Sequence, residues 1–336
     1  MKEAYLYEKK TGKTIECCMC AHRCIIKENS AGFCRVRKNN NGRLFSLTYD
    51  NIIASNLDPV EKKPLFHFLP GTKTYSIAAA GCNFTCSFCQ NFNISQVPRL
   101  SGAIPGKKIK PESIVEAALN SEAASISYTY TEPTVYFEFA YDTAKLASDA
   151  GLRNIFVSNG FMTEKCIDKI SPYLHAINID LKSYSDDFYR NICGGRLEPV
   201  LKSISLAHKK GIWVEVTTLL INGYNDSSEE IQALTDFLVS IDPHMPWHIS
   251  RFHPNFKFTD VRRTHEESLL SAMDIGQKNG LKYIYIGNIF GNKAESTFCH
   301  KCGNLLIARR GFMLTKKSLE SGCCTACGTE IPGIWT

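Results

Sequence analysis

The stretch YSIAAAGCNFTCSFCQN, residues 75–91, joins an apolar run to a loop that holds three cysteines. The small and apolar side chains at 75–80 predict a strand that is buried on both faces, as in a parallel sheet. Cys82, Cys86 and Cys89 follow in the spacing C-x3-C-x2-C. Loops at the carboxyl ends of parallel strands carry the chemistry of such folds. The stretch therefore predicts a parallel α/β fold with a thiolate site after its first strand.

The segment 75–287 alternates between strand and helix patterns. Each expected strand is short and mostly apolar, and the expected helices carry start signals: Thr163 is an N-cap, and Ser227 opens a capping box. After the first strand, the sequence predicts strands at 125–130, 154–158, 176–181, 213–220, 247–252 and 282–287, and helices at 111–121, 133–151, 163–170, 197–211, 227–240 and 265–280.

The number of these βα units limits the architecture. They span roughly 210 residues, whereas a full eight-unit barrel takes about 250. We therefore expect an α/β chain with a partial (β/α)6-type TIM barrel over residues 65–290. An open doubly wound sheet is the alternative. Small cysteine-rich, metal-binding ribbons are expected on either side, at residues 1–64 and 291–336.

The composition of the chain is that of a globular protein. Of its 336 residues, 44% are hydrophobic and 21% are charged, and the formal net charge is +6. This mild excess of basic residues does not reach the level of a dedicated nucleic-acid binder, so nucleic acid is not indicated. The first residues, MKEAYLYEKKTGKT, contain no apolar core of a secretory signal, and no run of 18 apolar residues follows. We expect a cytoplasmic protein without a membrane span.

Cysteines are numerous for a cytoplasmic protein. There are 15, and 13 of them fall within residues 17–34, 82–89 and 299–327. In a reducing compartment, clustered cysteines are more often metal ligands than disulfides. Cys166 and Cys193 stand apart and are expected to be ordinary buried thiols.

The central triplet lacks a fourth cysteine nearby. A [4Fe–4S] cluster contains four irons, so three thiolates leave one iron without a protein ligand. An open metal position can bind a substrate or cofactor, as it does at catalytic zinc sites. A zinc or structural site that is completed by a distant residue is the alternative.

The triplet, with Phe88 before its last cysteine, resembles the radical S-adenosylmethionine (SAM) enzymes. The resemblance implies that Cys82, Cys86 and Cys89 hold a catalytic [4Fe–4S] cluster whose open iron binds SAM. It also implies that reductive cleavage of SAM yields a 5′-deoxyadenosyl radical, which abstracts hydrogen from a substrate. Phe88 is then expected to lie near the adenine.

Further positions resemble the glycyl-radical-activase branch, which pyruvate formate-lyase activating enzyme typifies. TEP at 131–133 stands where the family has its amine-binding motif, SNG at 158–160 and IDLK at 179–182 follow later strands, and RFHP at 251–254 supplies a late histidine. A carboxylate that precedes the SNG stretch in the typical activase is Val157 here. The resemblance assigns cofactor binding to Thr131, Glu132, Ser158, Asn159, Asp180, Lys182 and His253.

A longer set of motifs is similar to the radical SAM protein of the AmmeMemoRadiSam system. It includes EKKPLFHFLPG at 61–71, TTLLINGYND at 217–226 and IPGIW at 331–335. This resemblance implies partners with AMMECR1 and Memo domains, and a reductant such as flavodoxin or ferredoxin. Two alternatives stay open: an activase of a glycyl radical enzyme, and a zinc-rich binding or scaffold protein without redox chemistry.

The outer cysteine clusters predict two more metal sites. At the C-terminus, two C-x2-C knuckles about twenty residues apart indicate a zinc ribbon. Rubredoxin-like iron or a second cluster is the alternative there, and Cys323 is a spare thiol. At the N-terminus, zinc and an auxiliary iron–sulfur cluster both stay open, because thiolates suit zinc and iron alike. Cys18 is extra there, and His22 is expected to be a bystander. The predicted ligands are Cys299, Cys302, Cys324 and Cys327, and Cys17, Cys20, Cys24 and Cys34.

Overall fold

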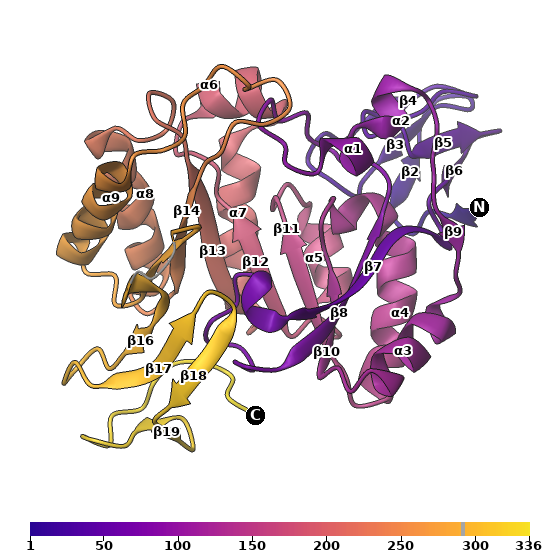
Figure 1. The fold of residues 1–336 in the computed structure, drawn as a ribbon. Helices are drawn as coiled ribbons and strands as arrows, with labels where there is room; N and C mark the ends of the chain where they lie inside the picture. The colour runs from indigo at the N-terminus through magenta and orange to yellow at the C-terminus, as the bar shows by residue number, and fades with distance from the viewer. Residues whose placement is uncertain (290–292) are drawn as a thin grey trace.

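A mixed nine-stranded sheet forms the centre of the computed structural model, which describes residues 1–289 and 293–336 (Figure 1). Its parallel strands pair in chain order, and two antiparallel strands, β7 (Asn51–Pro59) and β9 (Lys107–Lys108), extend it beyond β8. The parallel strands are β8 (Lys73–Ala79), β10 (Ser125–Tyr128), β11 (Arg153–Ser158), β12 (Ala176–Asp180), β13 (Trp213–Leu220), β14 (Trp247–Arg251) and β15 (Ile284–Gly287).

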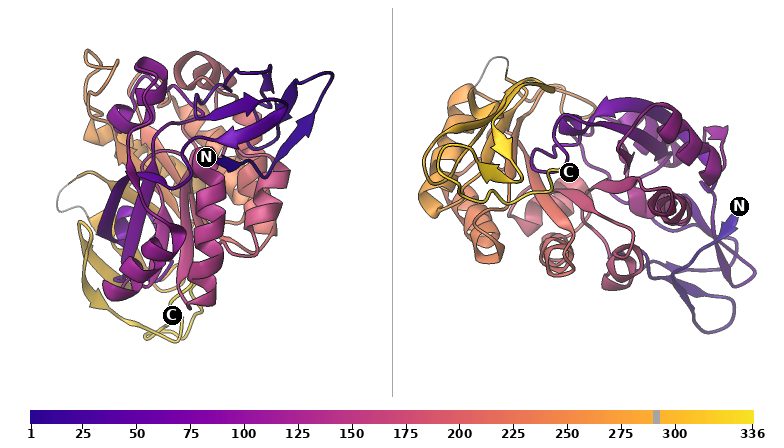
Figure 2. Two further views of the ribbon diagram at one scale, coloured as in Figure 1. Left: turned by 90° about the vertical axis from the view of Figure 1, so that its right-hand side faces the viewer. Right: turned by 90° about the horizontal axis from the view of Figure 1, so that it is seen from below.

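The crossover helices lie along one side of the sheet, as the view from below shows (Figure 2, right). Parallel strands that pair in chain order through right-handed crossovers must place every connecting helix on the same face. The crossover helices are α3 (Pro111–Asn120), α4 (Phe137–Asp149), α5 (Glu164–Ile170), α7 (Leu197–Lys209), α8 (Ser228–Ile241) and α9 (Glu266–Asn279). The loops between strands and crossover helices contain the short helices α1 (Phe92–Ser95), α2 (Val97–Leu100), η2 (Pro133–Tyr136), α6 (Asp186–Phe188) and η3 (Tyr189–Cys193).

The predicted α/β fold is confirmed, and the sheet is open. β15 and β9 are its two edges, and no strand of the described residues joins them into a closed barrel. The helix-start signals also hold, because the hydroxyls of Thr163 and Ser227 accept from N–H groups of the first turns. The expected capping box does not form. The Glu230 carboxylate accepts a hydrogen bond from the backbone N–H of Tyr184 at 2.8 Å instead.

The N-terminal residues form two small antiparallel sheets beside α4. Their strands are β1 (Lys2–Glu3), β2 (Tyr7–Lys9), β3 (Ile15–Cys17), β4 (Ile25–Ile26), β5 (Arg37–Asn40) and β6 (Arg43–Ser46). Arg37 joins this part to α4 through two bonds to the Glu138 carboxylate, at 3.0 and 2.8 Å, and both side chains are buried. The range 1–64 also contains β7, so the main sheet begins inside it, before the short helix η1 (Val60–Lys62).

The C-terminal residues form a ribbon that packs on β15. Phe66 and Tyr285 of the main body share an apolar cluster with Leu306 and Ile307 of the ribbon. The predicted domain boundary at 290 and 291 lies outside the described residues. The ribbon elements are η4 (Lys293–Glu295), β16 (Thr297–Phe298), β17 (Leu305–Arg310), β18 (Met313–Lys317), β19 (Leu319–Glu320) and β20 (Cys323–Cys324).

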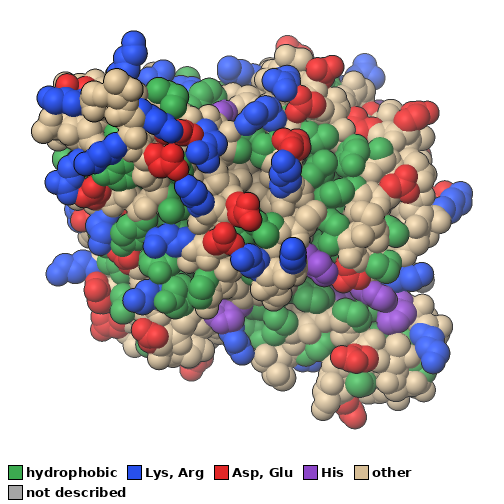
Figure 3. Space-filling model, turned by 180° about the vertical axis from the view of Figure 1, so that it is seen from behind, with side chains coloured by type: hydrophobic (Ala, Val, Ile, Leu, Met, Phe, Trp, Pro, Cys, Tyr) green, Lys and Arg blue, Asp and Glu red, His purple; other side chains and the backbone are tan. Residues whose placement is uncertain are grey.

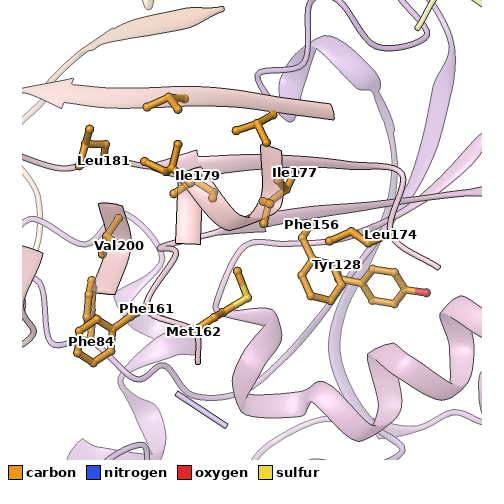
Figure 4. Packing of buried hydrophobic residues seen from close by; sticks show 14 of the residues in the cluster. Phe84, Tyr128, Phe156, Phe161, Met162, Leu174, Ile177, Ile179, Leu181 and Val200 are labelled. Carbon is orange, nitrogen blue, oxygen red and sulfur yellow. The ribbon is translucent and has the colours of Figure 1, made fainter. Parts of the chain in front are cut away.

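The main hydrophobic core lies between the sheet and its helices, and Figure 4 shows part of it. Ile177 and Ile179 of β12 are fully buried there, and Phe84 of the cysteine loop packs on Phe161 with ring centroids 5.1 Å apart. Burying such side chains contributes roughly 1.5–3 kcal/mol each. The cysteine loop is therefore part of the packed core, which restricts its conformation.

On the face that Figure 3 shows, Lys and Arg side chains are interspersed with Asp and Glu and do not gather into one band.

None of the helices in the described part of the chain has the length and apolar character that a membrane crossing requires.

Candidate functional site

A cavity of about 540 Å³ lies at the carboxyl ends of the parallel strands. Because these ends meet at one edge of the sheet, residues that are distant in the sequence converge there. The cysteine triplet follows β8, and polar side chains lie at or just after the ends of β10, β11 and β12. The predicted site residues that line the cavity are Cys82, Cys86, Phe88, Cys89, Thr131, Ser158, Asn159, Asp180 and Lys182.

The helix η3 holds the cysteine loop in place. The backbone N–H groups of Thr85 and Ser87 donate to the carbonyls of Cys193 and Ile192, at 2.8 and 3.1 Å. Before the triplet, Gly81 adopts a φ of +105°, and a Cβ there would lie 2.9 Å from Val36. A side chain at this position would therefore both strain the backbone and push the N-terminal part away.

Polar groups lie within hydrogen-bonding distance of two of the sulfur atoms. The Phe84 N–H donates to Cys82 Sγ at 3.3 Å, and the Ser95 hydroxyl lies 3.3 Å from Cys89 Sγ. Burial raises the pKa of Cys82 and of Cys89, so these thiols must lose protons when they bind a metal. Hydrogen bonds to sulfur stabilise the thiolates that result and tune bound clusters.

Cys193 is a neighbour of the site that the sequence did not reveal. An interaction with the Cys193 thiol lowers the pKa of Cys86. Cys193 is fully buried and is not among the residues that line the cavity, so it lies beside the triplet and does not complete it. The only signal was its unexplained position in NICGG, some hundred residues after the triplet.

Lys182 and Asp180 extend from the end of β12. Their charged atoms lie 2.9 Å apart, and the Lys182 ammonium lies 5.8 Å from the centre of the Phe88 ring. The hydroxyl of Thr131 donates to the Ala79 carbonyl at 2.8 Å, which ties the loop after β10 to the end of β8. A cation, a carboxylate and an aromatic ring thus face one space beside the cysteines.

Glu132 is buried and does not line the cavity. Its carboxylate accepts from the Ser158 hydroxyl at 2.9 Å, from the Asn159 N–H at 2.8 Å and from Thr134. Asn159 in turn donates to Asn83 at 2.7 Å, next to Cys82. The Glu132 carboxylate thus fixes the SNG segment, and the cofactor-binding role that the resemblance assigns to Glu132 stays a prediction.

His253 lies in a second cavity of about 630 Å³ and not among the residues that line the first. The two cavities adjoin, because Lys62, Gln90, Ser250 and Asn288 line both. The late histidine is therefore near the predicted site but separated from its cysteines.

The C-terminal cysteines form a tight group. Within the described residues, Cys299, Cys302, Cys324 and Cys327 are the one set of three or more potential ligand residues whose ligand atoms all lie within 4.8 Å of one another. Two of the sulfur pairs are 3.7 Å apart. Tetrahedral zinc with bonds of about 2.3 Å places neighbouring sulfurs about 3.8 Å apart. The group therefore fits one metal ion.

Removing one of these ligands should release that ion. We expect Cys324→Ala to lose about one metal ion per chain and to lower the temperature at which the ribbon unfolds, because metal binding in small modules supplies folding free energy. Metal analysis and a thermal scan would measure both effects. Cys323→Ala is the matched control, since this thiol is not in the group. Retention of the metal in the Cys324 variant would contradict the assignment.

The N-terminal cysteines surround a smaller cavity of about 20 Å³. Cys17, Cys20, Cys24 and Cys34 all line it, and Cys18 does not. Its wall also includes His22, whose Nε2 lies 2.7 Å from the carbonyl of Asn83 in the cysteine loop.

Comparison with known proteins places this site in a family. The sequence matches the radical SAM superfamily over residues 76–238. An uncharacterized protein of Methanocaldococcus jannaschii is 44% identical over 334 residues, which cover 98% of this chain and 99% of that protein. The pyruvate formate-lyase 1-activating enzyme of Escherichia coli is 19% identical over 165 residues, 47% of this chain and 65% of the enzyme.

A solved structure extends the likeness to the fold. A radical SAM methyltransferase from Sphaerobacter thermophilus superposes with a TM-score of 0.52 at 16% identity, over 71% of each chain. The family match begins in β8 and includes the cysteine loop and the ends of β10, β11 and β12. On this match, and with its motif lining the cavity at the strand ends, the chain belongs to the radical SAM superfamily.

Proposed function

We propose that this protein is a radical SAM enzyme whose Cys82, Cys86 and Cys89 hold a [4Fe–4S] cluster with one open iron. The cavity at the strand ends carries the proposal, because it unites three cysteines with polar side chains of neighbouring strands. Among the described residues, no fourth cysteine lines it. When bound, the cluster supplies an electron that cleaves SAM and yields a 5′-deoxyadenosyl radical, which abstracts hydrogen from the substrate.

The residues of the chain fit this cofactor pair. The N–H and O–H groups near Cys82 and Cys89 suit cluster-bound thiolates, and the cavity leaves room beyond them. Lys182 offers a cation to the carboxylate of SAM. The segment at Thr131 offers backbone acceptors to its ammonium group, and Phe88 offers a ring to its adenine.

The substrate would occupy the second cavity. It adjoins the first through four shared lining residues, and it combines apolar walls, such as Phe66 and Phe312, with polar groups, such as His248 and His253. Substrate sites are usually such mixtures of apolar surface and a few orienting polar groups. We propose that the strands form a partial barrel of six βα units whose mouth lies at the second cavity. His253 would then lie at the substrate end of the site.

Three further parts of the proposal rest on the resemblance. The partners would be AMMECR1-domain and Memo-domain proteins, and the electron donor would be a flavodoxin or ferredoxin. The site of action would be the cytoplasm, where thiols stay reduced. We also propose that the ion at the C-terminal cysteines is structural zinc, because a closed four-thiolate site leaves no open position.

The likeness to the E. coli activating enzyme favours a second candidate function. In an activase, the 5′-deoxyadenosyl radical would abstract hydrogen from a glycine of a partner enzyme. Only in that case would the holoenzyme, SAM and a candidate glycyl radical enzyme together give the electron paramagnetic resonance signal of a glycyl radical.

The decisive experiment is anaerobic reconstitution with iron and sulfide, followed by dithionite and SAM. We expect 5′-deoxyadenosine and methionine in equal amounts, measured by liquid chromatography and mass spectrometry. A protein that holds zinc and no iron at the triplet, and that forms no 5′-deoxyadenosine, would overturn the proposal and favour the zinc-rich scaffold.

A further inference from the structure

The N-terminal cysteines are arranged differently from the C-terminal ones. All four line one cavity, yet no three of their sulfur atoms lie within 4.8 Å of one another, the spacing that the C-terminal group meets. The catalytic triplet shares this wider spacing. Thiolates around one ion bind the same atom and are drawn together, whereas thiolates around a cubane bind different irons and stand further apart.

The surroundings of the cavity also point to an occupant that accepts a hydrogen bond. Arg37 lines the cavity and is 2% exposed. Its Nε has no hydrogen-bond partner within residues 1–289 and 293–336, although its two terminal nitrogens bind Glu138. A buried N–H without a partner costs about 1–3 kcal/mol, so an acceptor such as a sulfur atom is expected there.

We propose that Cys17, Cys20, Cys24 and Cys34 hold a second iron–sulfur cluster of the [4Fe–4S] type. Unlike the catalytic triplet, this set provides a thiolate for every iron, so the cluster has no open position. Apolar side chains, such as Met19, Ile26 and Phe33, complete the wall of the cavity and keep the cluster away from water.

The position of this cluster suggests its task. The Cys34 backbone packs against Gly81, where a Cβ would lie 3.6 Å from the Cys34 carbonyl oxygen, and Gly81 directly precedes Cys82. His22 and Asn83 form a second contact between the two loops, at 2.7 Å. In this part of the inference, which rests on the proposed function, one electron passes from a donor of the flavodoxin or ferredoxin class to the second cluster and then to the catalytic site.

The test is the metal content of a variant that cannot form the catalytic cluster. Cys82→Ala/Cys86→Ala/Cys89→Ala, reconstituted with iron and sulfide, should still bind about four irons per chain, the content of one cubane. After reduction with dithionite it should show the resonance signal of a reduced [4Fe–4S] cluster. A variant that holds zinc at the N-terminal cysteines and no iron would overturn the proposal.

Wild-type protein and a control variant complete the test. Wild-type chains should bind about eight irons and Cys17→Ala/Cys34→Ala chains about four, whereas Cys18→Ala should match the wild type, since Cys18 does not line the cavity. Iron in the triple variant without 5′-deoxyadenosine formation by the wild type would refute the proposed function alone. No iron in the triple variant, together with 5′-deoxyadenosine formation by the wild type, would refute this inference alone.

The electron transfer has its own measurement. Two reduced clusters in neighbouring loops broaden each other's resonance signals by magnetic coupling. The fully reduced wild type should therefore give a spectrum that differs from the sum of the spectra of the two single-cluster variants. A simple sum would overturn the relay.

Discussion

Cys86→Ala is expected to reduce 5′-deoxyadenosine formation to background while the chain keeps its fold. Two thiolates, Cys82 and Cys89, would remain for a cluster that takes three from the protein. The side chain is small and the loop is held by backbone bonds from Thr85 and Ser87, so the loss should be chemical and not structural. Iron content, circular dichroism and the 5′-deoxyadenosine assay would separate these effects.

Cys193→Ala is the matched control for this prediction. The thiol of Cys193 interacts with Cys86, is fully buried and does not line the cavity. Its removal creates a small void that costs on the order of 1 kcal/mol, and the cluster should still form. Loss of the cluster in the Cys193 variant, with retention in the Cys86 variant, would exchange the assigned roles of the two cysteines.

Glu138→Ala is expected to lower the free energy of unfolding by about 3–5 kcal/mol, because it leaves the buried Arg37 guanidinium without its partner. The pair makes two bonds of 3.0 and 2.8 Å, and the side chains are 3% and 0% exposed. Glu138 also accepts from the Tyr5 N–H at 3.1 Å, so the change loosens the N-terminal part from α4. Urea titration at constant metal content would measure the difference.

The double variant Arg37→Met/Glu138→Leu tests the cause. Replacing both charges with apolar side chains of similar size removes the unpaired charge, and such replacements are often close to neutral. The double variant should therefore be more stable than Glu138→Ala. If the double variant loses as much unfolding free energy as Arg37→Met and Glu138→Leu lose together as single variants, the pair is not coupled.

The strand-end residues of the site could be predicted from the sequence, because their position depends on local pattern. Apolar runs such as IAAA predict buried parallel strands, and parallel strands carry the residues after them to one edge. This pattern places the segments after the strands near Cys82, whereas the choice of Thr131, Asp180 and Lys182 within those segments came from the family resemblance. Helix ends were predictable for the same reason, since a cap depends on neighbours within one turn.

The sequence by itself thus determined the α/β order, the three cysteine groups and the edge of the sheet at which the chemistry lies. Only the tertiary structure decided that Cys193 interacts with Cys86, that Glu132 holds the SNG segment from behind, and that His253 lies in a second cavity. It also decided that, of the two predicted four-cysteine sets, only the C-terminal one has all its ligand atoms within 4.8 Å of one another. Periodicity and spacing report contacts within an element, whereas these contacts arise when side chains from distant elements share one packed volume.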